Sequence, residues 1–212
     1  MNAVNLLLSA AIAYLLGSVN ASVLLSKAMF GKDVRESGSG NAGATNMGRT
    51  YGKRAGGLTL LCDALKAVAA TAIGSALGGA WGLAAAGVFC LLGHCFPLYH
   101  GFKGGKGVSV GVMIGFAAGW QIGAAACAGF IIAVALSRRV SLGSIAGCVC
   151  AMITAGIVLR EPATLGMVLV CATLIIVRHR ENIGRLIRGE EKEFRFGHAK
   201  KNTEEGKGAK KS

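Results

Sequence analysis

Apolar residues in this chain gather into seven segments, separated by short polar or glycine-rich stretches. The segments run roughly over residues 4–26, 55–79, 80–99, 108–118, 120–136, 141–159 and 162–177. A helix that crosses a bilayer needs about 20 apolar residues, within a usual range of about 17 to 25. The pattern therefore predicts an all-α integral membrane protein with about seven transmembrane helices.

One apolar stretch, from Val108 to Leu136, is too long for a single straight span and short for two. Gly119, Trp120 and Gln121 interrupt it, so we expect a break there between two short or tilted helices. Fusing the two would leave six spans and would place the C-terminal tail across the membrane from the polar loop 27–54. The basic charge of both regions favours seven.

Lysine and arginine support this topology. With the N-terminus outside, the cytoplasmic parts are residues 27–54, 100–107, 137–140 and 178–212, and they hold 21 of the 23 Lys and Arg residues. Cytoplasmic loops of membrane proteins carry such an excess of positive charge. We therefore expect an external N-terminus and a cytoplasmic C-terminus, with residues 1–197 forming one membrane domain and residues 198–212 a disordered basic tail.

Composition agrees with a membrane protein, since 53% of the residues are hydrophobic, 16% are charged and 33 are glycine. The net charge of +13 could suggest nucleic acid. However, the basic residues lie in loops between apolar runs, which indicates topology and lipid contact instead. The seven cysteines lie almost entirely within apolar runs, so we predict neither a disulfide framework nor a zinc site.

The first polar cluster runs from Gly38 to Arg49, with the sequence GSGNAGATNMGR. Small hydroxyl and amide side chains supply directional hydrogen bonds, and an arginine can grip an oxyanion with two parallel bonds. A plain polar turn could use the same residue types, though rarely twelve in succession. The candidate binding residues are Ser39, Asn41, Thr45, Asn46 and Arg49.

The second polar cluster, Gly93 to Gly107, reads GHCFPLYHGFKGGKG. Glycines let backbone N–H groups approach an anion, and lysines add positive charge, so the loop is a candidate phosphate cradle. The alternative is a basic connector that only fixes orientation. It is not a nucleotide P-loop, because Gly107 stands where that motif needs Ser or Thr. The candidate residues are Lys103, Gly104, Gly105, Lys106 and Gly107.

The third polar cluster follows the last apolar segment and runs from Arg178 to Glu191. His179 and Asn182 are one helical turn apart, so a continuing helix would point a titratable ring and an amide at the same site. Histidine is the natural acid–base candidate near neutral pH. Taken alone, His179 would be an ordinary surface histidine.

Ionisable residues also occur within the apolar segments. Asp63 and Lys66 are three residues apart and share a helical face, which favours a structural ion pair, although charges within spans are often functional. We expect His94 to be a hydrogen-bonded packing residue. The three polar clusters lie on the same side in the predicted topology, which indicates an anion-binding site that faces the cytoplasm and is open to lipid.

The three clusters together resemble the bacterial acyl-phosphate:glycerol-3-phosphate acyltransferase family. Gly38–Arg49 matches its pattern G-S-G-N-x-G-A-T-N-x-x-R, and Arg178–Glu191 matches R-H-x-x-N-I-x-R-L-x-x-G-x-E. Gly93 to Gly107 matches the pattern between them, including Phe96-Pro97 and the run FKGGKG. One departure follows, since the family usually continues G-V-A-T where this chain has Gly107-Val108-Ser109-Val110.

The resemblance implies an enzyme of the bacterial cytoplasmic (inner) membrane that makes phospholipid precursors. Its substrates would be acyl phosphate and sn-glycerol 3-phosphate, and its products lysophosphatidate and phosphate, with no cofactor, metal or nucleic acid. The catalytic residues implied are His179, Asn182, Lys106 and Ser39. The substrate-binding residues implied are Asn41, Thr45, Asn46, Arg49, Lys103, Gly104, Gly105, Gly107 and Glu191.

Two other classes of protein fit some of these features. A transporter for an organic anion would use similar glycine loops, but it should place its site near the bilayer midplane and often shows internal repeats. A basic lipid-binding scaffold would not need the hydroxyl and amide side chains of the first cluster. The enzyme is therefore the favoured interpretation.

Overall fold

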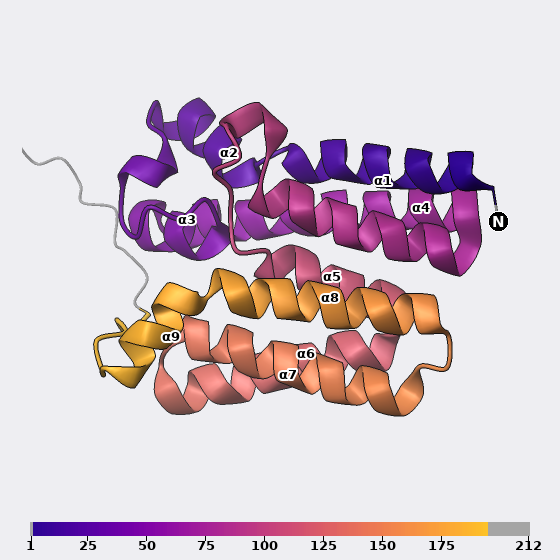
Figure 1. Cartoon of the computed structure of the whole chain (residues 1–212). Coiled ribbons are helices and arrows are strands. Elements are labelled where there is room, and N and C mark those ends of the chain that lie inside the picture. The colour runs from indigo at the N-terminus through magenta and orange to yellow at the C-terminus, as the bar shows by residue number, and fades with distance from the viewer. Residues whose placement is uncertain (1, 195–212) are drawn as a thin grey trace, which may run out of the picture.

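A computed structural model describes residues 2–194, and within this range every regular element is a helix. The helices form an elongated bundle whose long axes run roughly parallel or antiparallel (Figure 1). The all-α prediction is confirmed for the described residues. The tail predicted for residues 198–212 lies outside them.

The first apolar segment forms two helices, α1 (Ala3–Ser18) and α2 (Ala21–Phe30), rather than the single helix expected over residues 4–26. Val19 and Asn20 adopt extended backbone conformations between the two helices. The Asn20 side chain accepts a hydrogen bond from the Val23 N–H and thereby caps α2. This capping residue was the sequence signal for the break.

The first polar cluster connects two short elements, the 3₁₀ helix η1 (Val34–Glu36) and α3 (Ala44–Tyr51). The cluster therefore contributes a loop followed by two helical turns. The Tyr51 ring at the end of α3 stacks on Phe30 at the end of α2, with centroids 4.1 Å apart. This contact holds α3 against the α2 end of the molecule.

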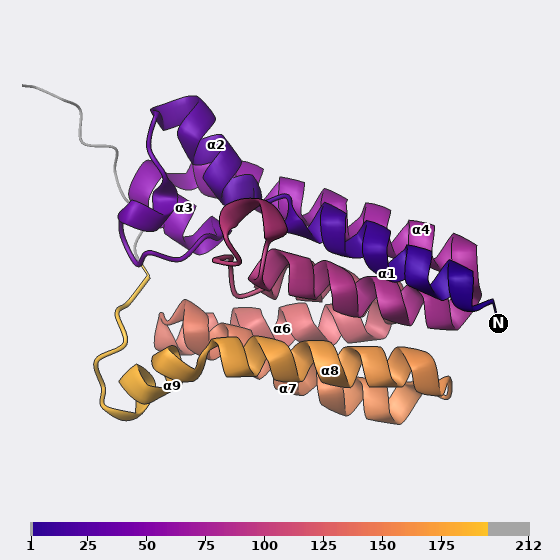
Figure 2. The ribbon, with the colours of Figure 1, turned by 45° about the horizontal axis from the view of Figure 1, so that its top comes forward.

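The second and third apolar segments together form α4 (Lys53–Cys95), which is broken at Gly78 and Gly79. Both glycines have non-helical backbone angles, and Gly79 has a φ of 57°. The backbones of Gly74 and Gly82 lie so close that a Cβ on Gly74 would be 2.5 Å from the Gly82 carbonyl oxygen. Residues eight apart in a straight helix are separated by about 12 Å. The chain therefore reverses here, and α4 consists of two antiparallel arms (Figure 2).

The second half of the chain begins after the 3₁₀ helix η2 (Leu98–His100) and contains α5 (Val108–Ala118), α6 (Trp120–Ser137), α7 (Val140–Val158), α8 (Pro162–Arg178) and α9 (Arg180–Ile187). Gly119 separates α5 from α6, as the sequence predicted. The bend between α8 and α9 is 57°.

Length and composition identify four spans among the described helices, or five when the bent pair α8 and α9 is counted as one span. The four are Ala3–Phe30, Lys53–His100, Trp120–Ser137 and Val140–Val158. At 11 residues, α5 is shorter than the about 17 to 25 residues usual for a helix that crosses a bilayer. The coarse prediction of an apolar helical membrane protein holds, whereas a count of seven spans does not follow from helix length.

Candidate functional site

The three polar clusters lie at one end of the bundle. In both views α2, α3, α9 and the loop before α5 gather there, while the N-terminal end of α1 lies at the opposite end (Figures 1 and 2). The glycine-rich loop joins the other two clusters. The Arg178 guanidinium donates to the Gly105 carbonyl oxygen at 3.3 Å, and the Gly105 backbone lies beside the carbonyl of Ala42 in the first cluster.

A chain of hydrogen bonds links the glycine loop to α9. The Lys106 ammonium donates to the Asn182 Oδ1 atom, and the Asn182 Nδ2 atom donates to the Glu191 Oε1 atom at 2.6 Å. Glu191 also accepts from the Ser141 hydroxyl at 2.7 Å and from the Arg185 Nε atom at 2.7 Å. Burial acts against the charged form of Glu191, yet these three donors together lower the pKa of its carboxyl. Glu191 thus remains an anion that orients Asn182.

Lys106 is partly buried and lies among charges of both signs, because Glu191 and Glu181 counter the positive charges of Arg185 and Arg178. Loss of solvent lowers the pKa of its ammonium, and the nearby positive charge of Arg185 lowers it further. An anion placed beside Lys106 would offset both effects. The site therefore favours a negatively charged ligand in front of the Lys106 and Asn182 side chains.

His179 lies at the junction of α8 and α9 and is 3% exposed. Its Nδ1 atom is 2.8 Å from the Ile175 carbonyl oxygen. Because a carbonyl oxygen only accepts, Nδ1 carries the proton, which leaves the Nε2 lone pair of the neutral ring free. Burial also lowers the pKa of the imidazole, so the neutral form is favoured. This is the tautomer and charge state that a general base requires.

The glycine loop differs from a simple anion cradle. The Gly104 N–H donates to the Cys95 carbonyl at 3.2 Å, and the Gly105 N–H donates to the His94 carbonyl at 3.1 Å. These two N–H groups are therefore turned into the protein rather than toward a ligand, which corrects that part of the prediction. A Cβ on Gly105 would lie 2.3 Å from the His94 Nε2 atom. These glycines thus pack the loop onto α4, and Lys106 faces the site.

The first cluster separates into structural and available residues. Asn46 is buried, and its amide accepts from the Ser39 N–H and donates to the carbonyls of Val34 and Ser37. It therefore shapes the loop, because both ends of its amide are occupied by backbone. Ser39 is exposed, while Asn41, Thr45 and Arg49 are half-buried. Among the described residues, Arg49 forms no ion pair.

Arg35 ties the first loop to the second. It donates to the carbonyls of His100 and Lys103, while Asp33 holds its guanidinium through two bonds of 3.0 and 2.8 Å. The hydrogen bond from Arg35 lowers the pKa of Asp33 to about 2 despite its burial. Lys103 is exposed, and it is its carbonyl that Arg35 contacts. Sequence reasoning missed this clamp, although the D-x-R spacing was visible.

Asp63 and Lys66 form the expected ion pair, with 2.9 Å between the Asp63 Oδ1 and Lys66 Nζ atoms. His94 is buried and lies 3.0 Å from the Lys66 Nζ atom through its Nδ1 atom, as expected for a hydrogen-bonded packing residue. The Ser109 hydroxyl donates to the Asp63 Oδ2 atom at 3.0 Å. Ser109 stands where the family pattern has alanine, and its hydroxyl points into the interior. The next residue, Val110, is fully buried.

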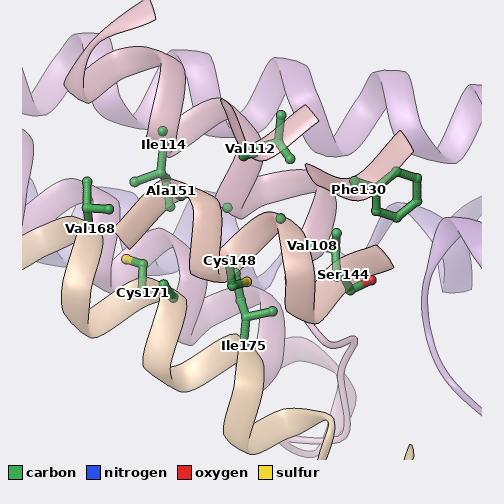
Figure 3. Close-up of a pocket in the computed structure, with 15 residues that line it drawn as sticks. Val108, Val112, Ile114, Phe130, Ser144, Cys148, Ala151, Val168, Cys171 and Ile175 are labelled. Atoms are coloured by element: carbon green, nitrogen blue, oxygen red, sulfur yellow. The ribbon is translucent and has the colours of Figure 1, made fainter. Parts of the chain in front are cut away.

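An apolar cavity of about 480 Å³, counting its open mouth, lies between α5, α6, α7 and α8 (Figure 3). It begins near the polar site, because Ile175 is one turn before His179 and Ser144 is one turn after Ser141. It continues to Ile114, Ala151 and Val168. Nothing in the local sequence pattern indicated this cavity, since its lining comes from four helices.

Among the described residues, no cluster of His, Cys, Asp or Glu could hold a metal ion.

Comparison with known proteins agrees with this geometry. Residues 7–189 match the family model described as glycerol-3-phosphate acyltransferase. The glycerol-3-phosphate acyltransferase of Geobacter sulfurreducens is 44% identical over 195 residues, which cover 90% of this chain and 98% of that protein. The corresponding protein of Finegoldia magna is 37% identical, over 90% of this chain and 97% of its own length.

Solved structures of PlsY (YgiH), an integral membrane glycerol 3-phosphate acyltransferase, share the fold. Its glycerol 3-phosphate form superposes with a TM-score of 0.85 and 37% identity, covering 89% of this chain and 95% of that one. Its lysophosphatidic acid form gives a TM-score of 0.82 and 35% identity, covering 89% and 94% of the two chains.

Proposed function

The chain belongs to the glycerol-3-phosphate acyltransferase family, and from this premise we propose the reaction that its site performs. The enzyme transfers a fatty acyl group from acyl phosphate to the 1-hydroxyl of sn-glycerol 3-phosphate. The acceptor oxygen attacks the acyl carbonyl carbon, the bond from that carbon to the phosphate oxygen breaks, and lysophosphatidate and phosphate are released. The observation that carries this proposal is the junction of Lys106, Asn182 and His179 with an apolar cavity.

Lys106 supports departure of the phosphate. Negative charge grows on the leaving oxygen in the transition state, and a fixed ammonium close to it is stabilising in a partly dehydrated site. Asn182 holds the Lys106 ammonium in place and is itself oriented by Glu191. Because phosphate is already a good leaving group, this electrostatic assistance is the main chemical task left to the protein.

The apolar cavity accommodates the acyl chain. A chain bound with its carboxyl end near Ile175 and Val108, which line this cavity, would present that end to the polar site. Burial of methylene groups stabilises binding by about 0.8 kcal/mol each. The cavity also accounts for a polar site at the end of a membrane-spanning bundle, since both the donor and the product carry a long apolar chain.

The first cluster binds the acceptor. Arg49 offers a planar guanidinium without an ion-pair partner among the described residues, which suits the phosphate of glycerol 3-phosphate. Ser39, Asn41 and Thr45 supply hydroxyl and amide groups for the remaining polar atoms. Asn46 contributes by shaping the loop. His179 accepts the proton of the 1-hydroxyl through its Nε2 atom as the new ester bond forms.

We also propose a topology of seven passes, with the N-terminus outside and the site facing the cytoplasm of a bacterial inner membrane. The two arms of α4 account for two passes, and short α5 and α6 account for one each. In a cysteine-free background, an impermeant thiol reagent applied outside should label a cysteine at Arg160 but not one at exposed Ser39. Labelling of Ser39→Cys from outside would overturn this orientation.

The reaction is tested with purified protein, palmitoyl phosphate and labelled glycerol 3-phosphate. We expect labelled lysophosphatidate and an equal amount of phosphate, with no added nucleotide or coenzyme A. A chelator should not reduce the rate. Uptake of labelled glycerol 3-phosphate into liposomes that contain the protein, without acylation, would instead identify a transporter.

A further inference from the structure

The cluster of Asp63, Lys66 and His94 is not used in the reaction described above, although it lies in the interior. Asp63 is 1% exposed and His94 is 2% exposed. Placing charged groups within a span is costly, and such groups usually have a task. An ion pair that served only to hold α4 together would need no contacts with other segments. The contacts of this cluster extend well beyond α4.

Lys66 reaches the start of the first polar region. Its ammonium donates to the Gly17 carbonyl at 3.2 Å and to the Val19 carbonyl at 2.8 Å, which lie at the break between α1 and α2. Those carbonyls are left without helical partners by the break. Lys66 therefore fixes the point at which the chain leaves the bundle to form α2 and the loop with Ser39.

Asp63 reaches the start of α5. The Ser109 hydroxyl donates to its Oδ2 atom at 3.0 Å, while Lys66 contacts the Oδ1 atom at 2.9 Å. Ser109 is in the first turn of α5, three residues after Lys106. One carboxylate thus joins the first arm of α4 to the helix that directly follows the glycine loop.

His94 completes the cluster from the second arm of α4. Its Nδ1 atom meets the Lys66 ammonium at 3.0 Å, and its carbonyl accepts the Gly105 N–H at 3.1 Å. A Cβ on Gly105 would lie 2.3 Å from the ring Nε2 atom and 2.6 Å from the Ala42 carbonyl. The ring therefore supports the place where the first and second polar clusters meet.

We propose that Asp63, Lys66 and His94 form a positioning network that sets the glycine loop and Lys106 in register with the first polar cluster. The network touches no substrate and acts through the Gly17 carbonyl, the Gly105 N–H and the Ser109 hydroxyl. This inference rests on the proposed acyl transfer, and it adds positioning residues that lie beneath the site. Misplacement of a reacting group by about 1 Å can lower a rate by about 10²-fold.

Ser109 provides the mildest test, because Ser109→Ala removes one hydrogen bond from Asp63 and leaves the Asp63–Lys66 ion pair intact. We expect kcat to fall about fivefold to twentyfold, with the KM for glycerol 3-phosphate changed less than about twofold. Ser109→Thr restores the hydroxyl and should recover kcat to within about threefold of the original protein. The matched control is Ser9→Ala, a buried helical serine that donates to the Asn5 carbonyl of its own helix.

His94 provides a second test that does not depend on Ser109. Asparagine keeps an acceptor near the place of Nδ1 for Lys66, whereas leucine has a similar volume and no acceptor. At equal amounts of folded protein, we expect the kcat of His94→Asn to be at least about tenfold higher than that of His94→Leu. The reason is again that a displaced reacting group lowers the rate. Thermal unfolding in detergent establishes that the compared proteins are folded.

The outcomes separate the two proposals. Absence of acyl transfer by the unaltered protein would overturn the proposed function itself. If the unaltered protein is active, kcat values for Ser109→Ala and Ser9→Ala that both equal the original would overturn the positioning network. Equal activity of His94→Asn and His94→Leu would overturn the part assigned to His94.

Discussion

The two halves of the bundle differ in how closely their helices approach. In the first half, α1 and the arms of α4 meet backbone to backbone, since a Cβ on Gly17 would lie 2.2 Å from the Cys90 carbonyl oxygen. A Cβ on Gly93 would lie 2.3 Å from the Tyr14 carbonyl oxygen. In the second half, α6 and α7 also meet at Gly143 and Gly147, but the space toward α5 and α8 forms the apolar cavity.

This difference matches two tasks. The first half carries buried charges and supports two of the three polar clusters, so close packing keeps those loops in place. The second half surrounds the apolar cavity in which we propose that the acyl chain binds. Lys106 and His179 lie where the two halves meet: Lys106 is on the loop that joins them, and His179 directly follows α8. Changes to each region should therefore alter different measured quantities.

The largest loss of activity is expected at Lys106, on the loop that joins the two halves. Lys106→Ala removes the positive charge that faces the site, and loss of one such group typically lowers kcat by about 10²- to 10³-fold. The measurement is steady-state acyl transfer at saturating acceptor. Lys32→Ala, which removes an exposed lysine outside the three clusters, is the control and should stay within about twofold. An active Lys106→Ala protein would remove Lys106 from the catalytic group.

His179→Asn should lower kcat by about 10²-fold, the lower end of the range for a general base, with little change in the KM for glycerol 3-phosphate. Because burial lowers the pKa of His179 below 6.5, the neutral base persists as the pH falls through 6.5. The acid limb of kcat should therefore lie below pH 6.5 in the original protein and vanish in the variant. A loss of less than about tenfold would show that a substrate phosphate accepts the proton instead.

The lowered pKa of His179 also affects the stability of the folded protein. The unfolded chain binds a proton at His179 more readily than the folded protein does, so the free energy of unfolding should rise with pH between the folded pKa and 6.5. His179→Asn should remove this part of the pH dependence. Thermal unfolding from pH 5 to 8 measures it, with stability expected to fall on the acid side.

Close packing of the first half is tested by Gly17→Ala. The added methyl meets the Cys90 backbone, which cannot move aside as a side chain can, so we expect a loss of about 1–3 kcal/mol in unfolding free energy. Gly156→Ala on α7 is the matched control, because no atom lies within 4 Å of the added Cβ. It should leave stability unchanged or slightly raised. Equal unfolding temperatures for the two variants would contradict the proposed difference between the halves.

Arg49→Lys should raise the KM for glycerol 3-phosphate by about tenfold, because a point charge replaces a group that can form two parallel bonds to phosphate. The KM for palmitoyl phosphate should change much less, since the cavity proposed for the acyl chain lies in the other half. Steady-state kinetics with each substrate varied in turn gives both constants. An unchanged acceptor KM would place Arg49 outside the acceptor site.

The smallest effect concerns the cavity. Ala151→Phe fills its inner part and should shift the ratio of kcat/KM between palmitoyl and decanoyl phosphate about fivefold toward the shorter chain, within the range expected for small changes in an apolar pocket. The matched change Gly156→Phe lies on the same helix and faces outward, and it should leave the ratio unchanged. If both variants keep the original ratio, the acyl chain lies elsewhere.

The sequence alone determined the helical membrane class, the breaks at Gly79 and Gly119, and the three polar clusters. These features depend on the local density and spacing of apolar, glycine and polar residues, which a single segment displays by itself. It also predicted the pairing of Asp63 with Lys66, since residues three apart share a helical face. The break at Asn20 was missed, because one capping residue is a weak signal within a long apolar run.

Only the tertiary structure decided which groups meet across segments. The Lys106–Asn182 bond joins residues 76 apart, and the Ser109–Asp63 bond joins residues 46 apart. The inward direction of the Gly104 and Gly105 N–H groups depends on where α4 ends, and the cavity depends on the fit of four helices. Such contacts arise from helix packing over long sequence separations, and the local pattern of a segment does not specify its distant partner.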